Sequence, residues 1–462
     1  MPGKYLLKVG LLFLLAAALA VNLLSAFGPE MGFDALWYHL TIPKLYLAAR
    51  AVYHIPGGLL YYSEMPRLTE MIFLFLLKFF PAGRETGPHL LGWAAGAGSA
   101  GILYLLARKY LEETYSLLAV LIFYVTPLVG WLSGSAYIDL ERTFWEILAL
   151  YLLLNRKIFW SGIALGLAIA SKTLALGTAG ILLLLGLMVY RDLKKILLLT
   201  VTAGVVALPW FVSAYLNTGY PFYPLGADIL DKSHRLVFQF PGLITDFVKL
   251  AIGSADPISP LFLMLLPFLI IFRKNMPKNS YPLIIYSVLA YLVWWLIPRT
   301  GGGRFLLPYL PVWALLSGLV IKNIPDRFLR RLLFAGALVI AVLNLFYRGI
   351  ATFRLLPVIL GRETRTAYLC RNLAKLPGTF YDCSGWFADH IQSTDLAYVS
   401  GVHNLYYLDF PFVEESWYRG EKVDYLIVPD GPWSENTETL YRSYRWQEVY
   451  RDNRQKLIVY RL

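Results

Sequence analysis

Charged residues and cysteines are scarce in this chain of 462 residues. Asp, Glu, Lys and Arg make up 16% of it, whereas soluble proteins keep roughly a quarter of their residues charged. Two cysteines are too few for a disulfide scaffold. Hydrophobic residues make up 58% of the chain, which excludes an intrinsically disordered protein. The composition therefore predicts an integral membrane protein.

The sequence also lacks the short motifs of several functional classes. It contains no GxxxxGK[ST] loop, no GxGxxG after an expected strand, no HExxH and no CxxC. The six histidines are scattered and suggest no metal cage. Nucleotide hydrolysis and a structural zinc site are unsupported, no cofactor is expected, and a divalent metal has no support in the sequence. An inverted repeat of short broken helices, typical of secondary transporters, is not evident.

Apolar segments recur along most of the chain. A run of about 20 apolar residues is long enough to cross a hydrocarbon core of roughly 30 Å as a helix. The segment 68–80 is shorter and lies between Pro66 and Pro81, which favours an interfacial or re-entrant helix. About eleven membrane helices are expected, near residues 5–27, 87–107, 114–132, 143–154, 158–171, 173–190, 196–215, 257–272, 280–297, 305–321 and 332–347.

The distribution of charge predicts the orientation. With the N-terminus in the cytoplasm, the short cytoplasmic connections carry sixteen Lys and Arg against four Asp and Glu, and the opposite loops are nearly balanced. Cytoplasmic loops of membrane proteins collect Lys and Arg. The formal charge of +12 is therefore a topology signal, and no nucleic-acid partner is expected. We expect a multi-pass protein of the cytoplasmic (inner) membrane with an extracytoplasmic C-terminal part.

Two domains are expected: a transmembrane domain over 1–347 and a small extracytoplasmic domain over 348–462. Short runs at 396–400, 424–428 and 456–460 are typical of strands set among polar turns. Both cysteines, Cys370 and Cys383, lie in this region. An exported compartment permits a disulfide between them, and two free buried thiols are the alternative. The fold class is thus an all-α polytopic membrane protein with a small C-terminal α/β domain.

The first long outer loop carries the leading candidate for catalysis. Asp34 follows the first helix and is flanked by Trp37, Tyr38 and His39, of which Tyr38 and His39 are candidates for substrate binding. A carboxylate partly removed from water can take a proton from an alcohol or amine as it attacks. The alternative is an interfacial helix with the usual aromatic belt, capped by the Asp. Further along this loop, Glu64 and Arg67 could face a polar substrate or could simply begin a helix.

A second acidic group precedes the span near 143–154. Asp139, Arg142 and Glu146 are spaced so that they share one helix face, with Glu141 beside them. Asp139 is a catalytic candidate, and Glu141 and Arg142 are candidates for substrate binding. An ionisable residue within a span is costly and is by default a functional candidate, and Arg142 is the expected partner of Glu146. A purely structural ion pair is the alternative.

Cations follow on the same expected side of the membrane. Lys172 lies between two short spans, where it could neutralise a phosphate or could snorkel to water. Arg299 and Arg304 flank three glycines, a pattern that suits an anion as well as a flexible turn. Acids that could activate an acceptor thus share one membrane face with cations that could hold a phosphate. No nucleotide sugar is available outside the cytoplasm, so a sugar donor would be lipid-linked.

These residues resemble the polytopic glycosyltransferases of the C-type (GT-C) fold, especially the bacterial branch similar to protein O-mannosyltransferases and the lipid A aminoarabinose transferase. The resemblance covers most of residues 5–321, and the C-terminal part matches less sharply. It rests on the sequences FDALWYHLTIP at 33–43, SAYID at 135–139, GLAIASK at 166–172, LPW at 208–210 with TGYPFYP at 218–224, and RFLLPYLP at 304–311.

The resemblance implies an inverting hexosyl- or pentosyltransferase. It would move a sugar from a polyprenyl-phosphate carrier to a lipid, glycan or protein acceptor outside the cytoplasmic membrane. Asp34 matches the family's catalytic base, and Asp139 matches the acid of the second outer loop that helps arrange the site. Relatives commonly place Lys-Pro-Pro after the acid at Glu64, whereas this chain has Met65-Pro66-Arg67, so Arg67, Lys172 or Arg304 would hold the phosphate. A flippase for lipid-linked saccharide and a non-catalytic scaffold are the alternatives.

Overall fold

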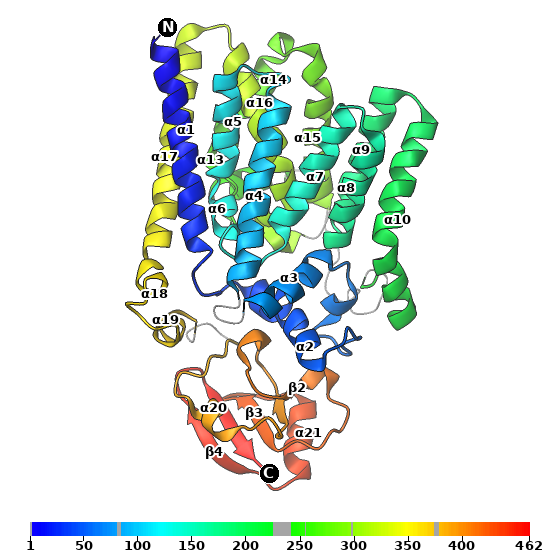
Figure 1. The fold of residues 1–462 in the computed structure, drawn as a ribbon, viewed down its shortest axis with the longest axis vertical. Coiled ribbons are helices and arrows are strands. Elements are labelled where there is room, and N and C mark those ends of the chain that lie inside the picture. Colours follow the sequence, from blue (N-terminus) through cyan, green and yellow to red (C-terminus); the bar gives the residue numbers. More distant parts are fainter. Residues whose placement is uncertain (1, 81–84, 225–241, 255, 297–298, 374–377) are drawn as a thin grey trace. The chain divides into compact units, whose positions relative to one another are not determined.

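The computed structural model describes residues 2–80, 85–224, 242–254, 256–296, 299–373 and 378–462 (Figure 1). The chain forms two compact units. The membrane unit comprises Met1–Phe27, Met65–Thr69 and Gly87–Leu355. The loop–tail unit comprises Gly28–Glu64, Glu70–Thr86 and Leu356–Leu462. The first long loop therefore groups with the C-terminal part, and the expected domain boundary at 347/348 falls inside a helix that ends at Phe353.

The membrane unit is a bundle of helices (Figure 1). Short 3₁₀ segments, η3 (Arg273–Asn275), η4 (Lys278–Ser280) and η5 (Arg299–Tyr309), lie before and after α15. The α-helices are α1 (Pro2–Ser25), α4 (Thr86–Ala107), α5 (Glu113–Tyr124), α6 (Pro127–Leu132), α7 (Asp139–Leu154), α8 (Ile158–Ser171), α9 (Ala175–Tyr190), α10 (Leu193–Thr218), α12 (Gly242–Ile252), α13 (Pro260–Leu265), α14 (Phe268–Ile271), α15 (Tyr281–Leu296), α16 (Leu310–Asn323) and α17 (Arg327–Phe353).

The expected polytopic membrane fold is confirmed. Each of the eleven expected spans coincides with helical structure, and within the described residues six helices are long and apolar enough to cross a membrane alone. Two expected spans are divided at prolines, between α5 and α6 at Pro127 and between α13 and α14 at Pro267. Proline has no N–H to donate and interrupts the helical hydrogen-bond ladder. The segment at 68–80 forms the 12-residue helix α3 (Leu68–Phe79).

Two groups of helices make up the packing of the membrane unit. In one group, α8 packs chiefly against α7 and α10, and α9 contacts all three of these helices. Helix α16 contacts α5, α13, α15 and α17, and it is buried almost throughout. A helix that is apolar on all sides is stable where neighbours surround it.

The first long loop contributes three helical segments to the loop–tail unit in addition to most of α3. They are η1 (Ala35–His39), α2 (Thr41–Ala49) and η2 (Tyr61–Glu64). Helices α18 (Leu356–Ile359), α19 (Arg365–Asn372), α20 (Trp386–His390) and α21 (Glu435–Ser443) come from the C-terminal part, with the short turns η6 (Leu405–Tyr407) and η7 (Glu415–Trp417). Helices in the first long loop were expected.

A five-stranded mixed sheet forms the C-terminal α/β domain, as expected. Its order is β2 (Phe412–Glu414), β1 (Ala397–Val399), β3 (Tyr425–Pro429), β5 (Leu457–Arg461) and β4 (Gln447–Asp452). Strand β1 is parallel to β2 and β3, whereas β5 is antiparallel to β3 and β4. Leu426, Val428 and Ile458 pack against Leu440 of α21 in the core of this sheet.

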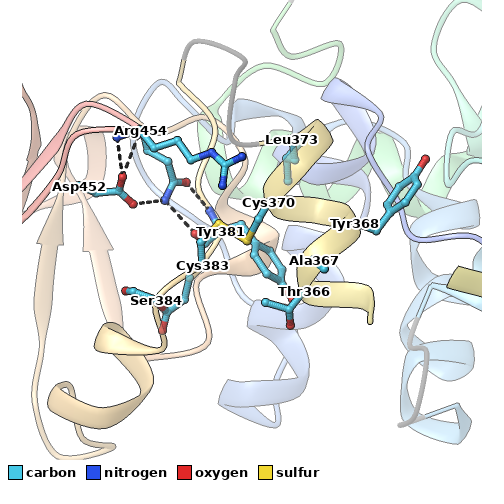
Figure 2. The surroundings of a disulfide bond; sticks show 12 residues. Thr366, Ala367, Tyr368, Cys370, Leu373, Tyr381, Cys383, Ser384, Asp452 and Arg454 are labelled. Atoms are coloured by element: carbon cyan, nitrogen blue, oxygen red, sulfur yellow. Dashed lines mark hydrogen bonds between the residues drawn. A yellow bond between two sulfur atoms is a disulfide. The ribbon is translucent and has the colours of Figure 1, made fainter. Parts of the chain in front are cut away.

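Cys370 of α19 and Cys383 form a disulfide, so the two thiols are not free (Figure 2). Their Cα atoms are 5.7 Å apart, a usual separation for a disulfide. The backbone of Tyr381, two residues before Cys383, exchanges two hydrogen bonds with the side chain of Gln455 at 2.7 and 2.8 Å. The disulfide and this side chain together fix the segment that precedes α20.

Candidate functional site

Asp34 lies at the start of η1 and is half-buried. The Tyr38 hydroxyl lies one helical turn later and donates to Asp34 Oδ2 at 3.4 Å. The Tyr38 ring stacks on Tyr62 with centroids 3.7 Å apart, and Tyr62 stacks on Tyr61 at 4.0 Å. Segments η1 and η2 thus pack three tyrosines beside the carboxylate. Burial raises the pKa of Tyr61, and the negative charge of Asp34 raises that pKa as well.

His39 and Glu64, expected to bind substrate, both pair with residues of the same unit. His39 Nδ1 lies 2.7 Å from Glu70 Oε1, and His54 Nδ1 lies 2.8 Å from Glu64 Oε1. His39 and Glu64 are each only 1% exposed. The two contacts tie η1 and η2 to other segments of the loop–tail unit, and the expected role of His39 and Glu64 in substrate binding remains a prediction.

Arg67 belongs to the membrane unit, and it is almost fully buried. Its guanidinium carbon lies 5.5 Å from the centroid of the Trp210 ring on α10. This distance is within the range of a cation–π contact. Two of the expected motifs, the segment that contains Arg67 and the Leu-Pro-Trp sequence at 208–210, therefore meet in the fold.

The membrane unit brings Asp139, Lys172 and Arg304 together. Lys172 Nζ donates to Asp139 Oδ1 at 2.7 Å, and the side chains are 12% and 0% exposed. Arg304 acts electrostatically on the same carboxylate and on Lys172. The Arg304 guanidinium carbon lies 4.7 Å from the ring centroid of Tyr137. One acid and two cations from three separate segments thus act on one another in the membrane unit.

The glycines before Arg304 allow a close approach of the chain at Asp256. A Cβ on Gly303 would lie 2.2 Å from the carbonyl oxygen of Asp256, so a larger residue would require the backbone to move. Gly302 adopts a positive φ of 54°, which glycine tolerates without steric cost. Arg299 begins η5, but its side chain lies outside the described residues, so its expected anion-binding role remains a prediction.

Arg142 and Glu146 form an ion pair inside α7, as expected. Arg142 Nε donates to Glu146 Oε1 at 2.5 Å, and both side chains are almost fully buried. Thr178 of α9 donates to Glu146 Oε2 at 2.5 Å, and the Tyr309 hydroxyl lies 3.1 Å from that of Thr178. Glu141 lies in the first turn of α7 and is 4% exposed. The Arg142–Glu146 pair therefore joins α7 to α9 and η5.

Lys44 and Arg365 were not predicted from the sequence, and both join the first long loop to the C-terminal part of the loop–tail unit. Lys44 Nζ donates to the carbonyl oxygens of Tyr406 and Leu408 at 2.6 and 2.9 Å and to Asp409 Oδ1 at 2.7 Å. Arg365 Nη2 donates to Glu85 Oε1 at 2.5 Å. Each bond links residues at least 280 positions apart. A local sequence pattern cannot predict a contact over such a separation.

In the part of the chain that the structure describes, no three His, Cys, Asp or Glu side chains are grouped in a way that could hold a metal ion.

Of the comparisons with known proteins, only the one with solved structures gives matches. No protein-family model matches the chain, and no curated protein matches it by sequence. ArnT from Cupriavidus metallidurans, solved bound to undecaprenyl phosphate, superposes with a TM-score of 0.68 at 14% identity, covering 97% of both chains. The same protein in its apo state gives a TM-score of 0.63 at 13% identity, with the same coverage.

A more distant structure shares the fold over most of the chain. The Archaeoglobus fulgidus oligosaccharyltransferase, in complex with Zn and sulfate, superposes with a TM-score of 0.51 at 13% identity. This match covers 90% of the present chain and 68% of that protein. The chain is a multi-pass membrane protein with the fold of the GT-C glycosyltransferases.

Proposed function

We propose that this protein is an inverting glycosyltransferase. It moves a hexosyl or pentosyl unit from a polyprenyl-phosphate carrier to an acceptor on the outer side of the cytoplasmic membrane. The N-terminus lies in the cytoplasm and the loop–tail unit outside, an orientation supported by the excess of Lys and Arg in the expected cytoplasmic loops.

The cluster of Asp139, Lys172 and Arg304 carries this proposal. Two cations placed near one another in a membrane unit can bind one anionic group together. A lipid phosphate supplies such an anion, and ArnT, which has the same fold, was solved with undecaprenyl phosphate bound. Arg binds phosphate through two parallel hydrogen bonds, and Lys acts as a point charge. We assign Lys172 and Arg304 to the phosphate, and Asp139 to the orientation of Lys172.

Asp34 is the proposed general base. Its carboxylate accepts the proton of the acceptor hydroxyl as the acceptor oxygen forms a bond to the anomeric carbon of the sugar. The bond from that carbon to the phosphate oxygen breaks, and its electron pair leaves with the polyprenyl phosphate. Lys172 and Arg304 stabilise the charge that grows on the leaving phosphate, where fixed donors lower the barrier most. Tyr38 orients the Asp34 carboxylate through its hydroxyl.

The experiment compares wild-type protein with Asp34→Asn in lipid nanodiscs. Radiolabelled polyprenyl-phosphate hexoses and pentoses are incubated with total cell-envelope acceptors, and the labelled product is counted. We expect transfer to fall at least about a hundredfold in the variant, within the usual contribution of a general base. Asp389→Asn, which changes an exposed carboxylate of the loop–tail unit, is the control and should transfer normally.

Two results would overturn the proposal. The first is that wild-type protein consumes no donor, and movement of the lipid-linked sugar across sealed vesicles then becomes the function to measure. Alternatively, Asp34→Asn could transfer as well as wild type, which would remove Asp34 from the chemistry.

A further inference from the structure

Three rings from two distant parts of the sequence meet beside Asp34. The His403 ring centroid lies 5.9 Å from that of Phe33 and 6.1 Å from that of Trp37. Phe33 and Trp37 are 5.5 Å apart, edge to face. Phe33 directly precedes Asp34, and Trp37 follows it by three residues. We call Phe33, Trp37 and His403 the aromatic platform; all three residues belong to the loop–tail unit.

The backbone around His403 is fixed by its own hydrogen bonds. His403 N–H donates to the carbonyl oxygen of Gly378 at 2.8 Å, and the N–H of Leu405 donates to the His403 carbonyl at 3.1 Å. Gly378 has a φ of 70°, and a Cβ there would lie 2.6 Å from His403 Cδ2. The imidazole therefore packs directly against the backbone of Gly378. This contact fixes the position of the ring in the absence of ligand.

The platform is accessible and uncharged. Phe33 is 49% exposed, His403 is exposed, and Trp37 is half-buried. Partial desolvation of the imidazole lowers the pKa of His403 below its usual value, so the ring is neutral at pH 7. The nearest charge along the chain is the carboxylate of Asp34, which would repel a phosphate. The platform is thus unsuited to the anionic donor and suited to a neutral ligand.

We propose that the aromatic platform binds a saccharide unit of the acceptor, with His403 as a positioning residue that directs an acceptor hydroxyl toward Asp34. A sugar ring presents a C–H face to aromatic rings and hydroxyl groups to the imidazole nitrogens, a combination typical of small-molecule sites. An extended peptide would instead add to a strand edge, and the platform consists of a helical turn and a loop. This inference rests on the proposed function, because it assigns the acceptor of the same reaction.

The first experiment measures saccharide binding without turnover. Full-length protein in detergent is titrated with methyl glycosides of common hexoses and pentoses, and binding is followed by saturation-transfer NMR. Removal of one stacking ring should weaken binding roughly 3- to 10-fold, so His403→Ala should raise the Kd by that factor. His403→Phe, which keeps a ring, should restore part of the affinity. His390→Ala is the control, because His390 is exposed in the same unit and stacks on Trp386 at 4.5 Å.

The second experiment separates positioning from structure. In the transfer assay, His403→Ala should raise the KM for solubilised cell-envelope glycans and glycolipids, while the KM for the donor and the midpoint of thermal unfolding stay at wild-type values. If the KM rises for glycolipids alone, the platform recognises a saccharide that is attached to a lipid. If the KM rises equally for glycolipids and free glycans, the platform recognises the saccharide without its lipid. Either result supports the proposal.

The outcomes distinguish the two claims. Unchanged Kd and KM in His403→Ala, with normal transfer by wild type, would overturn the platform and leave the transferase intact. Preferential binding of peptides over glycosides would also overturn it. Absence of transfer by wild type refutes the transferase, and the platform then fails as an acceptor site even if glycosides bind.

Discussion

Lys172 Nζ donates to Asp139 Oδ1 at 2.7 Å and joins the end of α8 to the first turn of α7. The two residues are 33 positions apart, and the Asp139 side chain is fully buried. Asp139 Oδ2 is also buried and accepts no hydrogen bond from any residue in the described part of the chain. The ion pair therefore fixes a lysine near the second cation, Arg304, where a phosphate could be bound between them.

Loss of the lysine charge should affect both stability and donor binding. Lys172→Met leaves the Asp139 carboxylate buried and without its ion-pair partner, which typically costs about 3–5 kcal/mol. We expect a lower midpoint of thermal unfolding and at least a tenfold weaker affinity for undecaprenyl phosphate. Native mass spectrometry of the nanodisc complex measures the affinity, and scanning fluorimetry measures the midpoint.

The double variant Lys172→Met with Asp139→Asn separates these effects. Removal of both charges should restore the unfolding midpoint toward wild type while the affinity for undecaprenyl phosphate stays low. If the double variant bound the lipid phosphate normally, Lys172 would have a structural role alone.

A second buried ion pair should be structural. Glu146→Gln leaves the Arg142 guanidinium in α7 without a negative partner, and we expect a loss of about 3–5 kcal/mol. Combined Arg142→Met and Glu146→Gln should recover most of that stability. We expect the double variant to keep donor affinity near wild type, as measured by the same native mass spectrometry. A large loss of donor affinity in the folded double variant would contradict this assignment and place Arg142 at the phosphate.

The sequence predicts those features that depend on neighbouring residues. Apolar segments indicated the spans, and the spacing of Arg142 and Glu146 indicated their pairing, because residues four apart face each other on a helix. Strands β1, β3 and β5 are runs of apolar residues and were expected. Strand β4 was missed because it is largely exposed and shows no alternation.

Contacts between distant segments were beyond prediction from one sequence. Nothing local distinguishes Lys44 from other lysines, yet its ammonium group donates to Tyr406, Leu408 and Asp409. His403 was not predicted for the same reason. Its ring approaches Phe33 and Trp37 only in the folded chain, because these residues are far apart in the sequence. The high density of aromatic residues around Asp34 was the one available signal.

Lys44 should hold the first long loop against the C-terminal part. Lys44→Met removes three hydrogen bonds, one of them to a carboxylate, and hydrogen bonds to charged groups contribute about 1.5–3 kcal/mol each. We expect faster amide hydrogen exchange in α2 and at 403–409, with exchange in the membrane helices unchanged. Lys78→Met, which changes an exposed lysine of α3, is the matched control. Equal exchange in the two variants would contradict the role of Lys44.

The disulfide should stabilise the loop–tail unit. Cys370 and Cys383 are 13 positions apart, and closing a loop of roughly this length contributes about 3 kcal/mol in the chain-entropy model. Replacement of both cysteines by serine should lower the unfolding midpoint. Mass spectrometry of peptides from non-reduced protein purified from membranes should show the linked pair. Two free thiols in that sample would contradict the disulfide.

Stability should depend on pH through Glu414. Burial raises the pKa of its carboxyl, although hydrogen bonds from Ser416 oppose the shift. A group whose folded pKa is raised contributes stability below its unfolded pKa and loses that contribution as pH rises through the folded value. Glu414→Gln should therefore raise the unfolding midpoint more at pH 7 than at pH 4. Glu435→Gln, at an exposed position on α21, should show no such difference, and an equal effect at both pH values for Glu414→Gln would contradict the shift.

The most direct measurement of the central claim is the balance of products in a purified reaction. Wild-type protein in nanodiscs is incubated with the undecaprenyl-phosphate sugar that supports transfer, and mass spectrometry counts glycosylated acceptor and released undecaprenyl phosphate. The proposed reaction predicts one molecule of undecaprenyl phosphate for each sugar transferred, inverted configuration at the anomeric carbon, and neither product with Asp34→Asn. Release of undecaprenyl phosphate without glycosylated acceptor, or equal yields from wild type and Asp34→Asn, would contradict it.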